Sequence, residues 1–153
     1  MAIRKKAPPA SSLVTDSRMA FIKTVKFTGL GLDEASVSID RLTLAQISKK
    51  DDTVNTEIDI DQKVIAHEDD FFVVAVDFEL IQRAKGSEAP LLSIKARFSA
   101  LFRLTERASE ESVSRFASLE ARLVFFPYLR HFVSDISYRM AIDPIVLPMT
   151  SEL

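Results

Sequence analysis

The sequence contains no cysteine and no tryptophan, and its 153 residues include only two histidines and three glycines. Without cysteine the chain can form neither disulfides nor thiolate metal sites, which fits a reducing compartment such as the cytoplasm. Two histidines are too few for most histidine-built metal centres. No apolar run approaches the ~20 residues of a membrane-spanning helix, and no apolar core follows the basic N-terminal residues. We therefore expect neither membrane insertion nor a secretory signal.

An excess of charge of one sign is also missing. The chain carries 20 Lys and Arg residues against 22 Asp and Glu residues, so its net charge is −2 at pH 7. This near balance predicts no general attraction to nucleic acid or to an anionic membrane. The length suits one domain. Residues 1–18 are rich in structure-breaking Pro and Ser, so we expect a disordered tail there and a single domain over residues 19–153.

Alternating apolar and polar residues predict four β-strands. The alternation is clearest over residues 56–66, 71–83 and 91–104, which are separated by short polar turns. An earlier strand is predicted over residues 21–28, just before two glycines that we expect to mark a bend, a bulge or a close backbone approach. Short turns between alternating strands predict an antiparallel meander with one solvated face.

The stretch between the first two strands, residues 33–54, keeps no single period. Its apolar residues are spaced by two in some places and by three in others. We interpret it as a long connection that contains a short strand or a helical turn. Long apolar connections are unusual in compact domains and often serve a function.

The period becomes helical after residue 104. Ser109 followed by Glu110 and Glu111 predicts a helix start, because acidic side chains are favoured at the positive end of a helix. This helix is expected to run into residues 123–140, where large apolar residues recur every three or four positions. The predicted fold is therefore α+β: a four-stranded antiparallel meander with C-terminal helices packed on one face. The surplus of apolar surface predicts an oligomer or an open binding surface.

Several short motifs, in this order and spacing, resemble the SecB family of export chaperones. Phe126-Pro127-Tyr128-Leu129-Arg130 is similar to the family's Phe-Pro-Tyr-Ala-Arg at the start of its long helix. The resemblance covers residues 21–148. The other motifs that carry it are Ile58-Asp59-Ile60-Asp61, Asp69-Asp70-Phe71-Phe72-Val73-Val74, Leu101-Phe102-Arg103-Leu104 and Asp143-Pro144-Ile145-Val146-Leu147-Pro148.

The resemblance implies a SecB-like domain that acts as a holdase without ATP or any other cofactor. It implies a homotetramer, built as a dimer of dimers, that binds unfolded polypeptides in exposed apolar grooves. These clients would be precursors for export or an antitoxin guarded by a dedicated chaperone. An extended client can form backbone hydrogen bonds with a sheet edge and place its apolar side chains in pockets. We expect the groove to be lined by Val37, Ile39, Leu42, Leu44, Ile58, Ile60, Phe125 and Phe132. For the last four, the alternative is an ordinary place in the core.

Two departures from the family pattern bear on partners. Lys95 stands where export members carry an acidic residue for docking to the SecA motor, and Gly29 or its neighbour replaces another such acid. Docking to SecA is therefore not expected.

Two other function classes are less well supported. A hydrolase would use His131 with Asp135 one turn along, but a nucleophile context is missing, and such pairs are usually surface contacts. Alternating acids at positions 59, 61, 77 and 79 could gather around a divalent cation, although acids on a solvated strand face are usually just hydrated.

A small-ligand carrier, with the helix closing a cup over the sheet, would enclose its pocket, whereas a chaperone would have open grooves. We therefore predict no enzyme, no catalytic residue and no metal site.

Overall fold

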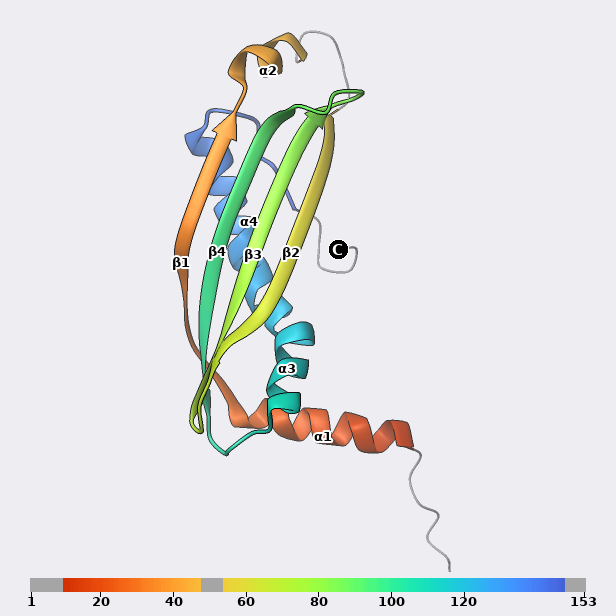
Figure 1. Ribbon diagram of the computed structural model, residues 1–153, viewed down its shortest axis with the longest axis vertical. Coiled ribbons are helices and arrows are strands. Elements are labelled where there is room, and N and C mark those ends of the chain that lie inside the picture. Colours follow the sequence, from red (N-terminus) through yellow and green to blue (C-terminus); the bar gives the residue numbers. More distant parts are fainter. Residues whose placement is uncertain (1–9, 48–53, 148–153) are drawn as a thin grey trace, which may run out of the picture.

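The computed structural model describes residues 10–47 and 54–147, and it has the α+β architecture predicted from the sequence. One layer is a four-stranded antiparallel sheet (Figure 1). Its strands are β1 (Val25–Ile39), β2 (Val54–His67), β3 (Phe71–Ala84) and β4 (Pro90–Leu104). The last three match the predicted strands to within two residues at each end, because their alternation is regular.

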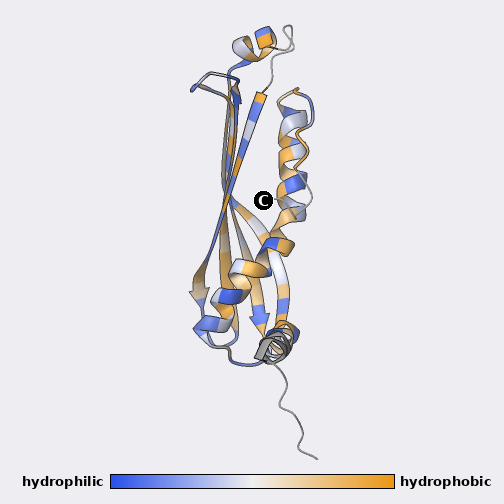
Figure 2. Cartoon of the chain, turned by 90° about the vertical axis from the view of Figure 1, so that its right-hand side faces the viewer, coloured by the Kyte–Doolittle hydropathy of each residue, from blue (hydrophilic) through white to orange (hydrophobic). Residues whose placement is uncertain are grey.

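The helices lie on one side of the sheet and at its two ends. Helices α3 (Glu110–Leu119) and α4 (Ala121–Arg139) form the second layer, which Figure 2 shows edge-on beside the sheet. The short helix α2 (Arg41–Ile47) sits at one end of the sheet, and α1 (Ala10–Thr24) lies at the other end. The opposite face of the sheet carries no helix among the residues that the structure describes.

The strand order is β1-β4-β3-β2. Strands β2, β3 and β4 form the predicted meander, but β1 pairs with β4 rather than with β2. The chain therefore passes through α2 from one edge of the sheet to the other before β2 begins. Three hairpin-linked strands with a fourth beside the last of them make a Greek key. This arrangement makes β1 and β2 the two edge strands and places α2 above the end of the sheet.

Strand β1 contains two register shifts, one between Phe27 and Gly29 and one between Leu32 and Glu34. Each marks a bulge, where one extra residue shifts the alternation of side chains. The bulges let every apolar residue of β1 stay on the helix side of the sheet, in register with buried positions of β4. These residues are Val25, Phe27, Leu30, Leu32, Ala35, Val37 and Ile39. The predicted irregular connection is therefore largely strand, followed by α2; residues 48–53 lie outside the described residues.

The core lies between the helix side of the sheet and α3–α4. Phe72 and Phe102 stack on neighbouring strands with ring centroids 5.0 Å apart, and Phe116 of α3 meets both edge-on. Helix α4 contributes its own buried stripe, which consists of Ala121, Phe125, Phe126, Leu129, Val133 and Ser137. Full burial of one large apolar side chain stabilises the fold by about 1.5–3 kcal/mol, so this layer contact dominates stability.

The prediction for the C-terminal helix needs correction. The expected single helix from residue 109 to 140 is two helices, which meet at Glu120. Its predicted start is confirmed: the Ser109 side chain accepts a hydrogen bond from the Ser112 amide at 3.2 Å, and Glu110 and Glu111 lie in the first turn.

The N-terminal prediction is wrong in part. Residues 10–18, expected to be a disordered tail, are helical, and Phe21 to Thr24 end this helix instead of starting a strand. Contacts distant in the sequence hold α1 in place: Phe21 meets Phe116 edge-on at 6.0 Å, and Arg18 pairs with Glu120. Such tertiary contacts override a local sequence pattern. Residues 1–9 lie outside the described residues.

Candidate functional site

An open groove of about 700 Å³ lies between α2, the ends of β2 and β3, and the chain that follows α4. Three of its lining side chains are polar and the rest are apolar. The lining residues are Arg41, Leu44, Ala45, Val54, Gln82, Ala141, Ile142, Asp143, Pro144, Ile145 and Val146. A surface of this kind can bury apolar side chains of a ligand without enclosing it.

One wall of the groove is α2, which is held at its N-terminal end by side-chain hydrogen bonds. Asp40 caps the helix: one carboxylate oxygen accepts from the Thr43 amide at 3.1 Å and the other from the Thr43 hydroxyl at 2.7 Å. The hydroxyl bond is the main reason that the pKa of Asp40 lies below its ordinary value. Arg41 then donates to the carbonyl oxygen of Met140 at 2.9 Å, which ties α2 to the end of α4.

The facing wall is the chain after α4, residues 141–147, which we call the wall segment. Helix α4 ends in a Schellman motif, with the Ala141 amide bonded to Tyr138 O at 3.0 Å and the Ile142 amide to Ser137 O at 3.2 Å. Ala141 adopts the left-handed conformation that this motif requires, with φ of 54°. At the far end of the segment, Leu147 is buried in the core.

The structure places the eight predicted groove residues in different surroundings. Leu44 lines the groove, and Leu42 stands on the outer side of α2 with 80% of its surface exposed. Val37 and Ile39 are not in a loop but at the end of β1. Ile58 and Ile60 are half-buried on the helix side of β2, where they pack against the core.

The two predicted helix residues are held differently. Phe132 is half-buried and meets Phe98 edge-on at 5.3 Å. Phe125 is only 1% exposed, so its assignment to the groove is wrong, and it belongs to the core. Helical spacing alone could not separate a residue that faces the sheet from one beside the groove.

The wall segment is what the sequence reasoning missed. Six of the groove-lining residues come from it, yet none was predicted to be part of the site. Its signal was a short apolar run between Pro144 and Pro148 directly after the long helix. Val54, the first residue of β2, was missed because the predicted strand began at residue 56.

A second apolar surface lies on the helix side of β1. Phe27, Leu32 and Val37 expose 43%, 49% and 39% of their surfaces, although they face the same side as the core. Tyr128 of α4 borders them, with its ring 6.4 Å from that of Phe27. The helix layer therefore leaves the β1 edge of this face uncovered.

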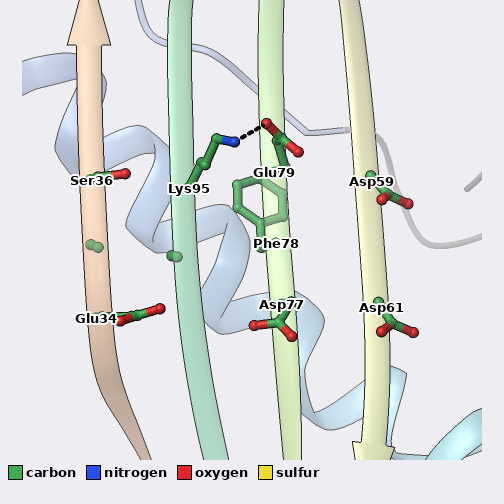
Figure 3. Close-up of a pocket in the computed structure, with 10 residues that line it drawn as sticks. Glu34, Ser36, Asp59, Asp61, Asp77, Phe78, Glu79 and Lys95 are labelled. Atoms are coloured by element: carbon green, nitrogen blue, oxygen red, sulfur yellow. Dashed lines mark ion pairs between the residues drawn. The ribbon is translucent and has the colours of Figure 1, made fainter.

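The opposite face of the sheet is charged. Asp59, Asp61, Asp77 and Glu79 gather there as predicted and line a shallow hollow (Figure 3). Basic residues of β4 pair with two of these acids: Arg97 donates to Asp77 at 2.6 and 3.0 Å, and Lys95 lies 2.8 Å from Glu79. The Arg97 hydrogen bonds lower the pKa of Asp77. Among the described residues no group of three or more acids and histidines is placed to hold a metal ion.

The histidine considered for hydrolysis lacks its expected partner. His131 is exposed on α4, and Asp135 accepts a hydrogen bond from Arg139 at 2.7 Å instead. In the part of the chain that the structure describes, no helix is both long and apolar enough to span a bilayer.

Comparison with known proteins relates this fold and groove to one family. No curated protein matches the sequence. The structure matches that of a SecB-like chaperone from Mycobacterium tuberculosis in complex with a ChAD peptide from the HigA1 antitoxin. The TM-score is 0.73 at 18% identity, over 89% of this chain and 98% of the other. A protein of unknown function from Streptococcus agalactiae matches with a TM-score of 0.48 at 7% identity, over 82% and 97% of the two chains.

The first of these likenesses shows a shared fold. A family model described as "Preprotein translocase subunit SecB" matches residues 35–150, which is most of the chain and includes the end of β1, all of β2, β3 and β4, and both walls of the groove. The chain therefore belongs to the SecB family.

Proposed function

We propose that this protein is an ATP-independent chaperone that holds unfolded polypeptides in the groove between α2 and the wall segment. Membership of the SecB family supports a chaperone role. The observation that carries the holdase proposal is the groove itself, because it is open and mostly apolar. A site with these properties favours extended chains over a small molecule, which would need an enclosed pocket.

The chemistry of the groove fits clients of varied sequence. Leu44, Val54 and Val146 offer apolar contacts, whereas Arg41, Gln82 and Asp143 are the polar side chains among the described residues that line it. Apolar burial contributes roughly 25 cal/mol per Å² and has no directional requirement, so many client segments satisfy it. Ile58 and Ile60 extend the proposed contact surface along β2, and Leu42 extends it along α2. Val37, Ile39 and Phe132 do not line the groove, and they remain proposed client contacts outside it.

The client is proposed to be either a precursor awaiting export or an antitoxin. The related Mycobacterium tuberculosis chaperone was solved with an antitoxin peptide, and we extend that choice to this chain only as a proposal. Docking to SecA is not part of it, because Lys95 is paired with Glu79 on the charged face. Pulldown followed by mass spectrometry separates the alternatives: many unfolded precursors favour export, whereas one small unstable partner favours a dedicated chaperone.

We also infer a homotetramer built as a dimer of dimers, located in the cytoplasm. The support is the exposed apolar row of Phe27, Leu32 and Val37 on the helix side of β1, a surface that a second copy of the chain would cover. Light scattering should give four times the chain mass of 17.1 kDa. A monomer mass would contradict the assembly.

The holdase activity itself is tested by aggregation assays. A chemically unfolded protein, unrelated to any expected client, is diluted into buffer with the chaperone at stoichiometric excess and without ATP. We expect light scattering from aggregates to be suppressed. Absence of protection with a wild-type chain that is folded by circular dichroism would refute the holdase proposal.

A further inference from the structure

Ser137 is the one buried polar side chain in the part of the chain that the structure describes, and its exposed fraction is 0%. It stands on the buried stripe of α4, four residues after Val133. A polar group in such a place destabilises the fold unless it is hydrogen-bonded, and alanine would pack there without that requirement. The hydroxyl therefore needs a reason beyond packing.

The bonds of Ser137 lead to the wall segment. Its hydroxyl donates to Val133 O at 2.7 Å and accepts from the Ile145 amide at 3.2 Å. Its carbonyl oxygen accepts from the Ile142 amide at 3.2 Å. Residue 137 thus bonds the wall segment at two points, and the stretch between them lines the groove.

Packing against the core also restrains the wall segment. Ile142 and Ile145 are half-buried against the core, and Leu147 anchors the end of the segment there, whereas Val146 is 73% exposed. At the start, Ala141 holds the left-handed conformation, which an alanine adopts at a cost of about 1–2 kcal/mol. The Schellman hydrogen bonds, the core packing and the bond from the Ile145 amide to the Ser137 hydroxyl together offset that cost.

We propose that Ser137 is a positioning residue of the client groove: it holds residues 142–146 as a fixed wall, so that a client meets a preformed site. This inference rests on the proposed holdase function. If the wall segment is already ordered, client binding does not have to order it. The entropy cost of binding is then smaller, and the client affinity is higher. Loss of the hydroxyl leaves the Ile145 amide without its acceptor and frees the wall.

The test compares S137A with S134A, which makes the same chemical change at an exposed position of the same helix. Client affinity is measured by fluorescence anisotropy with a labelled, permanently unfolded protein, at a temperature where all variants are folded. Because the chain has no cysteine, V146C accepts a single nitroxide whose mobility reports on the wall. We expect S137A to raise the client Kd about fivefold, the equivalent of one ordinary hydrogen bond, and to increase label mobility. S134A should change neither.

A second substitution, A141G, tests whether client affinity depends on the position of the wall segment or on the overall stability of the fold. Glycine adopts the left-handed conformation freely, so A141G should return the wall towards its place and recover part of the affinity lost in S137A. In the wild-type background, A141G should lower label mobility. This single variant also decides the matter if S137A does not fold, since higher label mobility in A141G would overturn the inference.

Three results would reject the role of Ser137. Unchanged label mobility in S137A would show that the hydroxyl does not hold the wall. Increased mobility with unchanged or tighter client binding would show that a fixed wall is unnecessary or competes with clients. Equal effects of S134A and S137A would show a nonspecific change in α4. A folded wild-type chain that binds no client would instead refute the proposed function itself.

Discussion

Replacing Leu42 with aspartate should weaken client binding about 10- to 50-fold without unfolding the protein. Leu42 stands on the outer side of α2, next in sequence to the groove-lining Arg41, and is 80% exposed in the free chain. Full burial of a leucine contributes about 1.5–3 kcal/mol. A client that covers the exposed four-fifths of this side chain therefore gains about 1.2–2.4 kcal/mol, and the loss of this gain corresponds to the stated range of Kd.

The same substitution should leave the fold almost unchanged. Leu42 lies in the first turn of α2, where an acidic side chain is favoured by the helix dipole. Exposed substitutions of this kind usually change the free energy of unfolding by no more than about 0.5 kcal/mol. Chemical denaturation monitored by circular dichroism measures this quantity directly.

The assay for binding is fluorescence anisotropy of a labelled unfolded client titrated with each variant. Ile65→Asp is the matched control, because Ile65 is also exposed, at 53%, but lies at a bulge of β2 away from α2. Unchanged affinity in L42D would refute a client contact at Leu42. A loss of more than about 2 kcal/mol in stability would show that Leu42 is packed rather than free. Equal weakening by both variants would show that binding is not confined to the groove side.

Three further predictions concern the fold. Ala141→Gly should raise the free energy of unfolding by about 0.5–1 kcal/mol, because relief of the left-handed alanine exceeds the extra entropy of glycine in the unfolded chain; a lower denaturation midpoint would contradict this. Leu129→Ala should destabilise the fold by about 2–5 kcal/mol, since Leu129 is 1% exposed, and a loss below 1 kcal/mol would place it outside the core. Asp77→Asn should flatten the acid dependence of stability. Arg97 holds the folded-state pKa of Asp77 below its ordinary value of 3.8, so this stabilisation is present above that pH and is lost as the pH falls through the lowered pKa. Identical slopes of unfolding free energy against pH for both proteins would show that the pair contributes nothing.

The strands that the sequence predicted well are those with an unbroken alternation. β4 alternates from Leu92 to Leu104, and β3 buries every second residue from Phe72 to Leu80 with Ala75 in addition, because one face packs on the helices and the other is charged or partly exposed. β1 was misread because its apolar residues are spaced 3, 2, 3, 2 and 2 from Phe27 to Ile39, and each spacing of three marks a bulge. The bulges were visible in the sequence, but only the partner strand shows that they keep one face apolar.

The groove was less predictable than the fold. Leu44 was found because the family resemblance pointed to the long apolar connection as part of a groove, and Leu44 does line the groove. The wall segment could not be found in the same way, since its place depends on how α4 ends and on two bonds to Ser137. Phe125 and Phe132 have the same residue type on the same helix, and only packing against the sheet makes one of them core and the other half-buried.

The two bulges of β1 bear on how the protein avoids joining itself into fibrils. An edge strand of 15 residues with an apolar face is a template on which strands of other molecules could add one after another. The register shifts divide it into three short regular runs, residues 25–27, 29–32 and 34–39, so that a straight incoming strand cannot stay aligned past either shift. The protein can in this way keep an apolar edge available for specific contacts and still avoid edge-to-edge aggregation of its own copies.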